Sequence, residues 1–403
     1  MNLTNVEFGD ETVVPIFDAV PERVEFHPYQ ANYDFVNFLI LGSDRLSSTE
    51  SYRTDVIIVV AINRTTQTIR LLSIPRDLYV YIPGWGMDRI NTAELHQTQL
   101  AAVSHPLGLL AETIEYNLGI RVDHLARIDF AGFEFLVDLV GGLPIPVDCV
   151  VTGYQFSTES NTWVPFSLEP GLYQMDGSSA LWYVRQRIES SDFDRNRRQQ
   201  IVLRALWDKI KTVDLISTSA IWGELASYLE TDVTYDQILS FVPLILNLDV
   251  ARIDSQFIGI EQVRQWQTPS DSSVLVFAPD ALPQVVEKFL APQNDRQFIS
   301  EQAIVNVLNG SSVENADQLA AAQLRWLGIS ASALGNTPQH TAATSIFDHT
   351  GQVKGSSLSI IQQAFNVLPN QVNLTINESG PDFTVVIGES YESCLTKPWE
   401  PFQ

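Results

Sequence analysis

The stretch Asn37–Arg89 contains NFLILGSDR at 37–45, RTDVIIVVAIN at 53–63 and TIRLLSIPRD at 68–77. Its apolar runs, Phe38–Leu41, Val56–Ile62 and Ile69–Ile74, predict three strands, and Asn63–Thr66 is typical of a turn between the second and third. Acids and arginines stand at the ends of these runs: Asp44, Arg45, Arg53, Asp55, Arg76 and Asp77. If the strands are neighbours, these charges converge at one sheet edge. Carboxylates there can hold a hard cation such as Mg²⁺, and arginines can grip phosphate oxygens. The pattern therefore predicts a site for a phosphorylated substrate.

The charge balance supports a local anion site rather than a broad basic surface. The net charge is −24, which argues against a nucleic-acid partner and against an anionic membrane reached through a basic face. Only five of the 24 positive residues are lysines, and twelve of the 19 arginines fall between 45 and 89 or between 185 and 204. The alternative for any single arginine is a surface pair with a nearby acid.

The length of 403 residues predicts two or three domains. We expect an irregular lead-in at 1–33, an α/β domain with a mixed central sheet flanked by helices at 34–292, a linker at 293–302, a small α/β domain at 303–390 and a loose tail at 391–403. The elements expected in the first domain are helix 107–118 ended by Gly119, strand His124–Ile128, helix Phe130–Val140, strand Leu143–Val147, helices Ser217–Leu229 and Tyr235–Leu248, short strands to about residue 278, and helix Asp280–Leu290. Those expected in the second are strands Ala303–Leu308, Thr344–Phe347, Val372–Ile376 and Phe383–Ile387, and helices Ala316–Leu327 and Ser357–Phe365.

A second arginine-rich segment lies between two predicted helices. Asp176-Gly177-Ser178 is typical of a helix start and predicts helix Ser179–Arg187, with Arg185 and Arg187 near its end. The polar run Ile188–Asp194 predicts a mobile connection, and Asp194–Gln200 leads into a helix that continues to Ile210. Arg195 and Gln199 share a helical face if that helix begins early. A solvated helix start is the alternative; it is disfavoured because basic residues oppose the helix dipole there unless an anion offsets them.

Other signals are weaker. The segment 82–91, with Gly84 and Gly86, is either a plain turn, which we favour, or a loop whose amides approach a ligand. Cys149 and Cys394 allow one disulfide or two free thiols, and no zinc-binding pattern is present. We expect three histidines of the first domain to be structural: His96, His105 and His124.

Six motifs in order resemble the LytR-CpsA-Psr family of bacterial cell-wall enzymes over about residues 34–212, and 303–390 more loosely resembles the LytR C-terminal domain. The motifs are NFLILGSD at 37–44, RTD at 53–55, SIPRD at 73–77, DRIN at 88–91, YVRQR at 183–187, and DFDR at 192–195 with RQQ at 198–200. The resemblance implies transfer of a glycopolymer from a polyprenyl-pyrophosphate carrier to a peptidoglycan acceptor. It also implies an extracytoplasmic, cell-envelope location and an apolar tunnel for the lipid.

The resemblance also implies roles for individual residues. Asp44 and Asp55 match two aspartates that hold Mg²⁺. Arginines and a glutamine around the pyrophosphate match Arg53, Arg76, Arg185, Arg187, Arg195 and Gln199, and Arg198 belongs to the same motif. Asp77 is either a base or, as we favour, an acid that orients an arginine. This agrees with the sequence pattern, because phosphoryl transfer needs alignment and charge stabilisation more than covalent chemistry.

Three functions remain open from the sequence: the transferase, a hydrolase that uses water at the same site, and a non-catalytic lipid-binding envelope scaffold. The intact acid and arginine motifs disfavour the scaffold. The family usually carries a membrane helix before the catalytic domain. No run of 18 apolar residues is present here, so we expect contact with the membrane through the lipid substrate.

Overall fold

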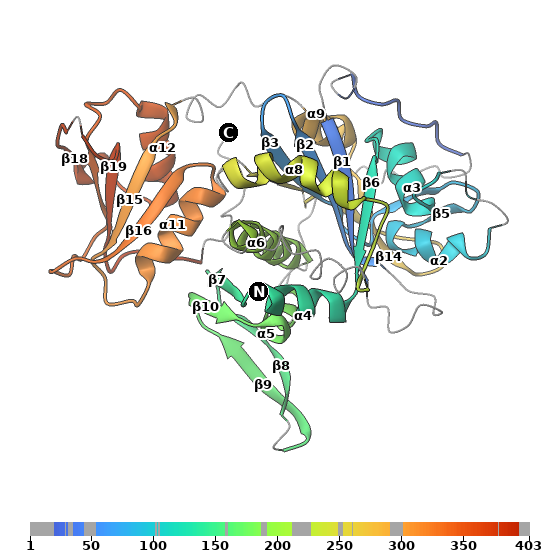
Figure 1. The fold of residues 1–403 in the computed structure, drawn as a ribbon, viewed down its shortest axis with the longest axis horizontal. Helices are drawn as coiled ribbons and strands as arrows, with labels where there is room; N and C mark the ends of the chain where they lie inside the picture. Colours follow the sequence, from blue (N-terminus) through green and yellow to red (C-terminus); the bar gives the residue numbers. More distant parts are fainter. Residues whose placement is uncertain are drawn as a thin grey trace.

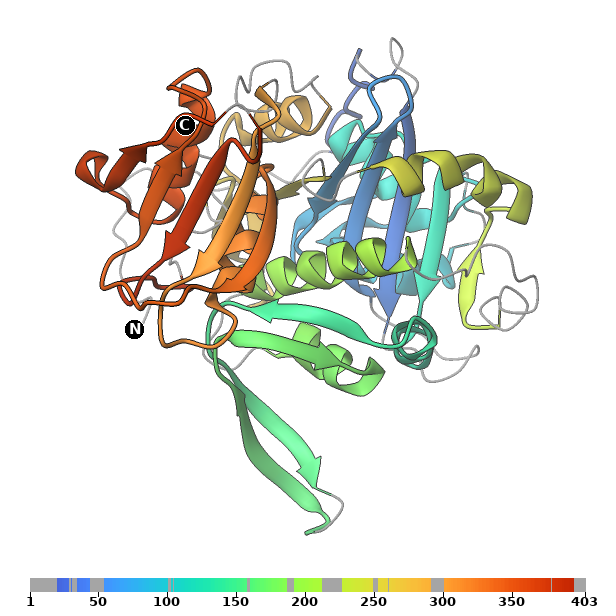
Figure 2. The same ribbon diagram turned by 60° about the vertical axis from the view of Figure 1, so that its left-hand side comes forward.

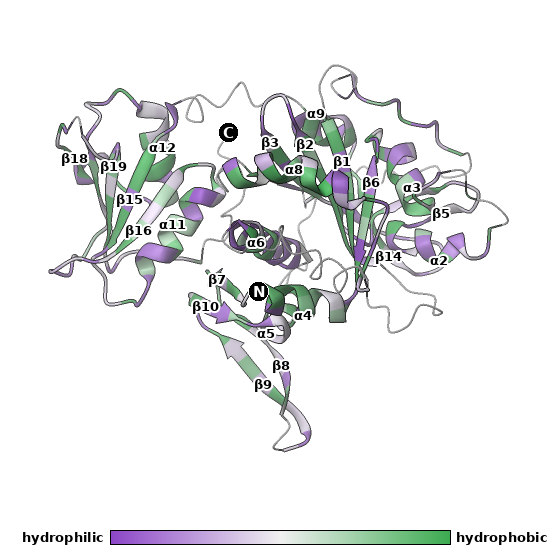
Figure 3. Ribbon diagram, in the orientation of Figure 1, coloured by the Kyte–Doolittle hydropathy of each residue, from purple (hydrophilic) through white to green (hydrophobic). Residues whose placement is uncertain are grey.

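The structure is a computed structural model. It describes residues 20–28, 30, 35–43, 54–100, 103, 105–157, 160–186, 192–211, 227–248, 253–259, 261–290, 301–377 and 379–394. Two α/β units lie side by side, one built around a central sheet and one formed by the C-terminal residues (Figure 1). Figure 3 shows that hydrophobic residues concentrate in the strands of both units. No described helix is both long and apolar enough to cross a bilayer.

The central sheet, within the described residues, has six strands in the order β11-β6-β1-β2-β3-β12. The strands β1, β2 and β3 are consecutive antiparallel neighbours, β6 and β12 run parallel to β1 and β3, and β11 is antiparallel to β6. This confirms the expected mixed sheet and the adjacency of its first three strands. Their bounds are β1 Phe35–Ser43, β2 Thr54–Asn63, β3 Thr68–Ser73, β6 His124–Ile128, β11 Leu229–Thr231 and β12 Ile253–Phe257.

Helices cover both faces of this sheet, and the two faces are packed differently. Alternate residues of a strand point to opposite faces. Leu39 and Leu41 of β1 are fully buried in a core with α3 (Leu109–Leu118) and α9 (Ala281–Leu290). Val36, Phe38 and Ile40 point the other way and are only partly buried, against α8 (Tyr235–Asn247) and α6 (Asp192–Ile210). The second face therefore keeps apolar side chains that the protein itself does not fully cover.

A third layer packs on the far side of α6. It contains α4 (Phe130–Leu139), α5 (Gly177–Arg185), β7 (Leu143–Val147) and β10 (Gly171–Met175), and its core includes Tyr183 and Val202. The strands β8 (Val151–Ser157) and β9 (Thr162–Leu168) form a hairpin that extends from this layer away from the rest of the molecule (Figures 1 and 2).

The glycine-containing segment after β3 is the turn of a small hairpin. Strand β4 (Tyr79–Ile82) pairs with β5 (Gly86–Arg89), and Gly84 and Gly86 have φ of 77° and 128°. Such φ values favour glycine, which explains both residues and supports the expected plain turn. A short helical segment, η1 (Ile90–Thr92) and α2 (Ala93–Gln97), follows, and a further hairpin pairs β13 (Val263–Gln267) with β14 (Ser273–Phe277).

The C-terminal unit, where the structure describes it, is a five-stranded sheet in the order β16-β15-β19-β17-β18 packed with two helices. Its core contains Val305, Leu324 and Phe383. The small C-terminal α/β fold is confirmed. The bounds are β15 Ile304–Asn309, α11 Ala316–Trp326, β16 Ser330–Asn336, β17 Ser345–Asp348, α12 Gly355–Ala364, η3 Pro369–Gln371, β18 Val372–Leu374 and β19 Phe383–Ile387.

Some expectations are corrected. The helix expected over Ser217–Leu229 lies mostly outside the described residues, and its last residue begins β11, because Leu229 pairs with Ile128 of β6. The mobile connection expected up to Asp194 ends earlier, since α6 already begins at Asp192. The tail expected to be loose from Tyr391 is attached over its described part, because Cys394 forms a disulfide with Cys149. The expected linker at 293–302 lies almost entirely outside the described residues.

Candidate active site

The antiparallel order of β1, β2 and β3 brings the charged strand ends to one edge of the central sheet. Ser43, the last residue of β1, pairs with Thr54 at the start of β2, and Ser73 at the end of β3 pairs with Ile58 of β2. Asp55 and Arg76 meet there: Nη1 of Arg76 donates to Oδ1 of Asp55 at 2.5 Å. The two side chains are 30% and 22% exposed, so a ligand can reach them.

Asp77 lies between two guanidinium groups at the same edge. Its Oδ2 is 3.5 Å from Nε of Arg76, and its Oδ1 is 3.5 Å from Nε of Arg89. Arg89 also donates from Nη2 to the carbonyl of Ser273 at 2.8 Å. Asp77 therefore links β4–β5 to the end of β3 and fixes the direction in which Arg76 points.

The start of α6 is buried rather than solvated. Arg195, Arg198 and Gln199 are 3%, 4% and 7% exposed. Burial lowers the pKa of Arg198 because it disfavours the charged form, and Tyr183 and Asp194 oppose this effect. Nη2 of Arg198 donates to the carbonyl of Gln186, just after α5. The alternative of a solvated helix start is wrong.

Gln200, which sequence reasoning left without a role, connects α6 to the strand ends. Its Nε2 donates to Oγ of Ser73 at 2.8 Å and to the carbonyl of Gln256 at 3.1 Å. Ser73 ends β3 three residues before Arg76. The contact therefore holds the arginine-bearing turn of α6 beside the edge that carries Asp55 and Arg76.

Arg185, at the end of α5, is placed differently. Its Cζ lies 4.2 Å from the centroid of the Phe130 ring at the start of α4, and its side chain is exposed. Helix α5 is capped by Asp176, whose side chain accepts a hydrogen bond from the amide of Ser179 at 2.8 Å. Arg185 thus stands beside an apolar helix rather than in direct contact with the Asp55–Arg76 cluster.

Half-buried apolar side chains extend along the sheet from this edge. Phe38 packs edge-on to Phe241 of α8, with ring centroids 5.4 Å apart. Val36, Ile40, Val56 and Val60 lie in the same cluster, and so do Leu203 and Trp207 of α6. An apolar surface between sheet and helices, continuous with a cationic edge, suits a ligand with an apolar chain and an anionic head.

Three predicted site residues lie outside the described part of the chain: Asp44, Arg53 and Arg187. Among the residues that the structure describes, no three His, Cys, Asp or Glu side chains come together as a metal site. A full protein cage is not needed for Mg²⁺, which usually takes one or two carboxylates together with substrate phosphates. Asp55 supplies one such carboxylate at the site, so the donor chemistry fits this ion.

Sequence reasoning missed a buried ion pair next to Asp55. Glu94 of α2 contacts Arg127 of β6 and accepts a hydrogen bond from Oγ1 of Thr54 at 3.2 Å. Arg127 also donates to Glu230 at 2.6 Å. Burial raises the pKa of Glu94, and Arg127 opposes that effect. Two features of the sequence could have indicated this ion pair: Arg127 is the lone arginine in the strand HLARI, and Glu94 is the lone acid in the helix AELHQ.

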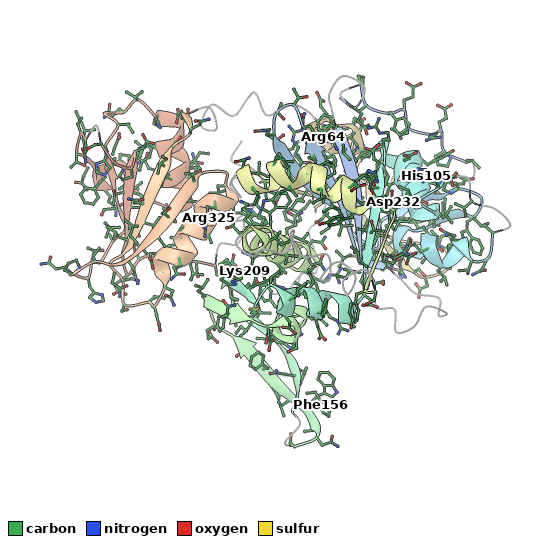
Figure 4. The ribbon with its side chains drawn as sticks, in the orientation of Figure 1. Arg64, His105, Phe156, Lys209, Asp232 and Arg325 are labelled. Carbon is green, nitrogen blue, oxygen red and sulfur yellow. A yellow bond between two sulfur atoms is a disulfide. The ribbon has the colours of Figure 1, made fainter. Side chains whose placement is uncertain are left out.

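Arg197 and Arg204 of the second arginine window line a cavity between α6 and the C-terminal unit, and Nη2 of Arg204 also donates to Oγ of Ser255 in β12 at 3.0 Å. Arg197 pairs with Asp148, and burial together with Arg198 lowers its pKa to about 9. The Cζ of Arg204 lies 4.4 Å from the centroid of the Trp326 ring on α11. This cavity, of about 580 Å³, lies between α6 and α11, with Lys209 and Arg325 in its lining (Figure 4).

The three histidines have structural partners, as expected. His96 contacts Asp88 at 2.7 Å, His105 contacts Glu115 at 3.3 Å and His124 contacts Asp232 at 2.7 Å.

Sequence comparisons connect these features to known proteins. A model of the LytR_cpsA_psr family matches residues 10–281, and a model described as LytR cell envelope-related transcriptional attenuator matches residues 302–391. The chain is 31% identical over 237 residues to polyisoprenyl-teichoic acid–peptidoglycan teichoic acid transferase TagT of Bacillus subtilis, covering 57% of this chain and 69% of TagT. It is 31% identical over 227 residues to TagU of Oceanobacillus iheyensis, a transferase of the same description, covering 55% and 66%.

It is also 31% identical over 202 residues to the regulatory protein MsrR of Staphylococcus aureus, covering 49% of this chain and 56% of MsrR. The matches therefore span only 56% to 69% of these three relatives. Among solved structures, the fold resembles that of B. subtilis TagV, with a TM-score of 0.52 and 23% identity over 64% of this chain and 97% of that chain. A Streptococcus agalactiae protein gives a TM-score of 0.51 and 20% identity over 66% and 91%.

Proposed function

The chain belongs to the LytR_cpsA_psr family, and from that premise we propose that it is a transferase that moves a glycopolymer from a polyprenyl-pyrophosphate carrier to peptidoglycan. The relatives named as teichoic acid transferases support this class of reaction. The single observation that carries the proposal is the joint position of Asp55, Arg76 and the buried arginine turn of α6 beside a half-buried apolar sheet face. Membership of this family also leads us to propose an extracytoplasmic location at the cell envelope.

The reaction is a phosphoryl transfer. A sugar hydroxyl of the acceptor attacks the phosphorus that carries the glycopolymer and a new P–O bond forms. The bond to the bridging oxygen breaks so that polyprenyl phosphate leaves, and the proton of the hydroxyl passes to solvent. Mg²⁺, held by Asp55 with Asp44, would neutralise charge on the pyrophosphate oxygens when bound.

The residues of the chain have separate tasks in this scheme. Arg76, with Arg195 and Arg198 of α6, stabilises the negative charge that spreads over the phosphate oxygens during transfer. Asp77 orients Arg76, a role supported by its contacts with both Arg76 and Arg89. The apolar residues between β1, β2 and α8 hold the polyprenyl chain, so that the anionic head lies at the charged edge.

The test is binding of a detergent-solubilised long-chain polyprenyl pyrophosphate, with and without Mg²⁺, by wild type, Asp55→Ala and Arg76→Ala, followed by transfer to peptidoglycan fragments. We expect Mg²⁺-dependent binding that both substitutions weaken. Transfer should fall about 10²–10³-fold in Arg76→Ala, because one well-placed charge donor is lost.

The matched control is Arg23→Ala. Arg23 pairs with Glu115 of α3, on the face of the sheet opposite to the apolar surface, and its side chain is 51% exposed. This variant should keep binding and transfer close to wild type. Full activity of Arg76→Ala, or binding that ignores both the metal and the two site substitutions, would reject the proposal.

A further inference from the structure

The β8–β9 hairpin carries a continuous aromatic face near its free end. Phe156 pairs directly with Trp163, and Tyr154 pairs with Pro165. Side chains two residues apart on a strand point to the same face, and so do the side chains of two directly paired residues. These four side chains therefore lie on the same side of the hairpin. The rings of Phe156 and Trp163 meet edge-on, with centroids 5.7 Å apart.

This aromatic face is open to solvent. Tyr154, Phe156 and Trp163 are 53%, 45% and 64% exposed. Figure 4 labels Phe156 near the free end of the hairpin, away from the body of the protein. A cluster of large exposed apolar side chains is costly in water and usually marks a contact surface.

The base of the hairpin is fixed to α5, the helix that ends at Arg185. Nε1 of Trp182 in α5 donates to the carbonyl of Tyr154 at 2.9 Å, and Phe166 packs edge-on against the Trp182 ring with centroids 4.9 Å apart. A Cβ on Gly153 would lie 2.1 Å from Oε1 of Gln186, so strand β8 and the end of α5 are in close contact. An isolated two-stranded hairpin is marginally stable, and this packing holds it in one direction.

The charge of the hairpin points to the chemistry of its partner. Its two strands, Val151–Ser157 and Thr162–Leu168, include no Asp, Glu, Lys, Arg or His, and the sequence between them contains one acid, Glu159, although the chain as a whole has a net charge of −24. An acidic protein is repelled by anionic lipid headgroups, so a contact with a bilayer must use uncharged, apolar side chains. Trp and Tyr combine an apolar ring with a polar group and are favoured at the membrane–water interface.

We propose that the aromatic face of the β8–β9 hairpin, formed by Tyr154, Phe156, Trp163 and Pro165, inserts into the interfacial region of a lipid bilayer and so positions the active site over its substrate. The choice of a lipid surface rests on the proposed function, since a polyprenyl-linked donor resides in a bilayer. A glycan strand is the less favoured partner, because the four residues of this face offer one hydroxyl and no amide or carboxylate side chain to bond sugar hydroxyls.

The experiment is sedimentation of the full chain with vesicles of phosphatidylcholine, alone or mixed with phosphatidylglycerol, at low and high salt. Wild type should bind the zwitterionic vesicles with little dependence on salt, and no better when phosphatidylglycerol is added. The double variant Phe156→Ser with Trp163→Ser should bind at least about tenfold more weakly, because two exposed rings no longer leave water. Brominated phosphatidylcholine should quench wild-type tryptophan fluorescence, and Trp163→Phe should bind but lose most of that quenching.

The matched control is Trp85→Ser, which removes another exposed aromatic ring, 44% exposed in the β4–β5 turn, and should leave vesicle binding unchanged. The double variant should keep the melting temperature and the binding of detergent-solubilised polyprenyl pyrophosphate, which separates this proposal from the proposed function. No vesicle binding by wild type, or equal binding by the double variant, would overturn the proposal. Loss of binding to insoluble peptidoglycan with no effect on vesicles would assign the face to glycan instead.

Discussion

At the scale of single residues, the buried ion pair of Glu94 and Arg127 lies next to the start of β2. The two side chains are 4% and 10% exposed. Thr54, which donates to Glu94, directly precedes Asp55. A buried charge that loses its partner is strongly unfavourable, because it can be neither hydrated nor neutralised easily. The pair therefore anchors Thr54, the first residue of β2 and the neighbour of Asp55 in the chain.

We predict that Glu94→Leu lowers the free energy of unfolding by about 3 kcal/mol, because it leaves the buried Arg127 without its main partner. Urea unfolding of the full chain measures the change. Glu230 is a second partner of Arg127, and the Glu230 side chain is 59% exposed. Glu230→Ala should therefore lower the free energy of unfolding by less than about 1 kcal/mol. Equal losses in the two variants would contradict this account.

At the scale of elements, α5 and α6 carry the second group of candidate site residues. Helix α5 begins at a cap formed by Asp176 and ends at Arg185. Helix α6 directs Arg198 to the end of α5 and Gln200 to Ser73 of β3, whereas Arg204 contacts both β12 and Trp326 of α11. The two helices meet where Arg198 donates to the carbonyl of Gln186. A change at the start of α5 therefore reaches both α4 and α6.

We predict that Asp176→Ala lowers the free energy of unfolding by about 1 kcal/mol near pH 7, because the amide of Ser179 loses its cap. Hydrogen bonds from the amide and hydroxyl of Ser179 lower the pKa of Asp176. A carboxylate with a lowered pKa stabilises the fold above its ordinary pKa and loses that effect as the pH falls through the lowered value. The difference between wild type and variant should therefore shrink on going from pH 7 to about pH 3.

Urea unfolding at several pH values measures this difference. Ser178→Ala is the comparison, since Oγ of Ser178 donates to Asp176 at 3.1 Å and lowers its pKa less than Ser179 does, so this variant should show a smaller pH-dependent loss. A difference between wild type and Asp176→Ala that stays constant with pH would show that the cap does not act through its charge.

At the scale of the whole molecule, the C-terminal unit is connected to the unit of the central sheet covalently and by packing. The disulfide between Cys149 and Cys394 joins residues 245 positions apart. Beside it, Oγ of Ser393 donates to the carbonyl of Asp148 at 2.7 Å. Trp326 of α11 packs between Phe257 of β12 and Arg204 of α6. The C-terminal unit therefore packs against the side of α6 opposite to the side that carries Arg198.

We predict that Cys149→Ser with Cys394→Ser lowers the free energy of unfolding by about 5 kcal/mol, because the unfolded chain is no longer restrained by a long closed loop. Thermal and urea unfolding with and without reductant measure the effect. Reductant should lower the stability of wild type to that of the double variant and leave the variant unchanged. A double variant as stable as oxidised wild type would mean that packing alone holds the two units.

The sequence by itself determined the first three strands, their turn and the edge at which their charges meet. This followed from local patterns, since apolar runs and the charges that bound them depend on neighbours in the chain. The antiparallel order then required Asp55 and the end of β3 to lie at the same edge. The family motifs added Asp44, Arg53 and Arg187, whose positions stay predictions.

Only the tertiary structure decided which arginines of α6 lie toward the candidate active site and which lie toward the C-terminal unit. The 3.6-residue period of α6 separates Arg198 from Arg197 and Arg204, but the period does not say which face meets the sheet and which meets α11. That choice depends on Ser73, Asp148 and Trp326, which are distant in sequence. For the same reason, local patterns could not predict three further features: the pairing of the cysteines, the ion pair of Glu94 and Arg127, and the direction of the β8–β9 hairpin. Each depends on packing between segments that are far apart in the sequence.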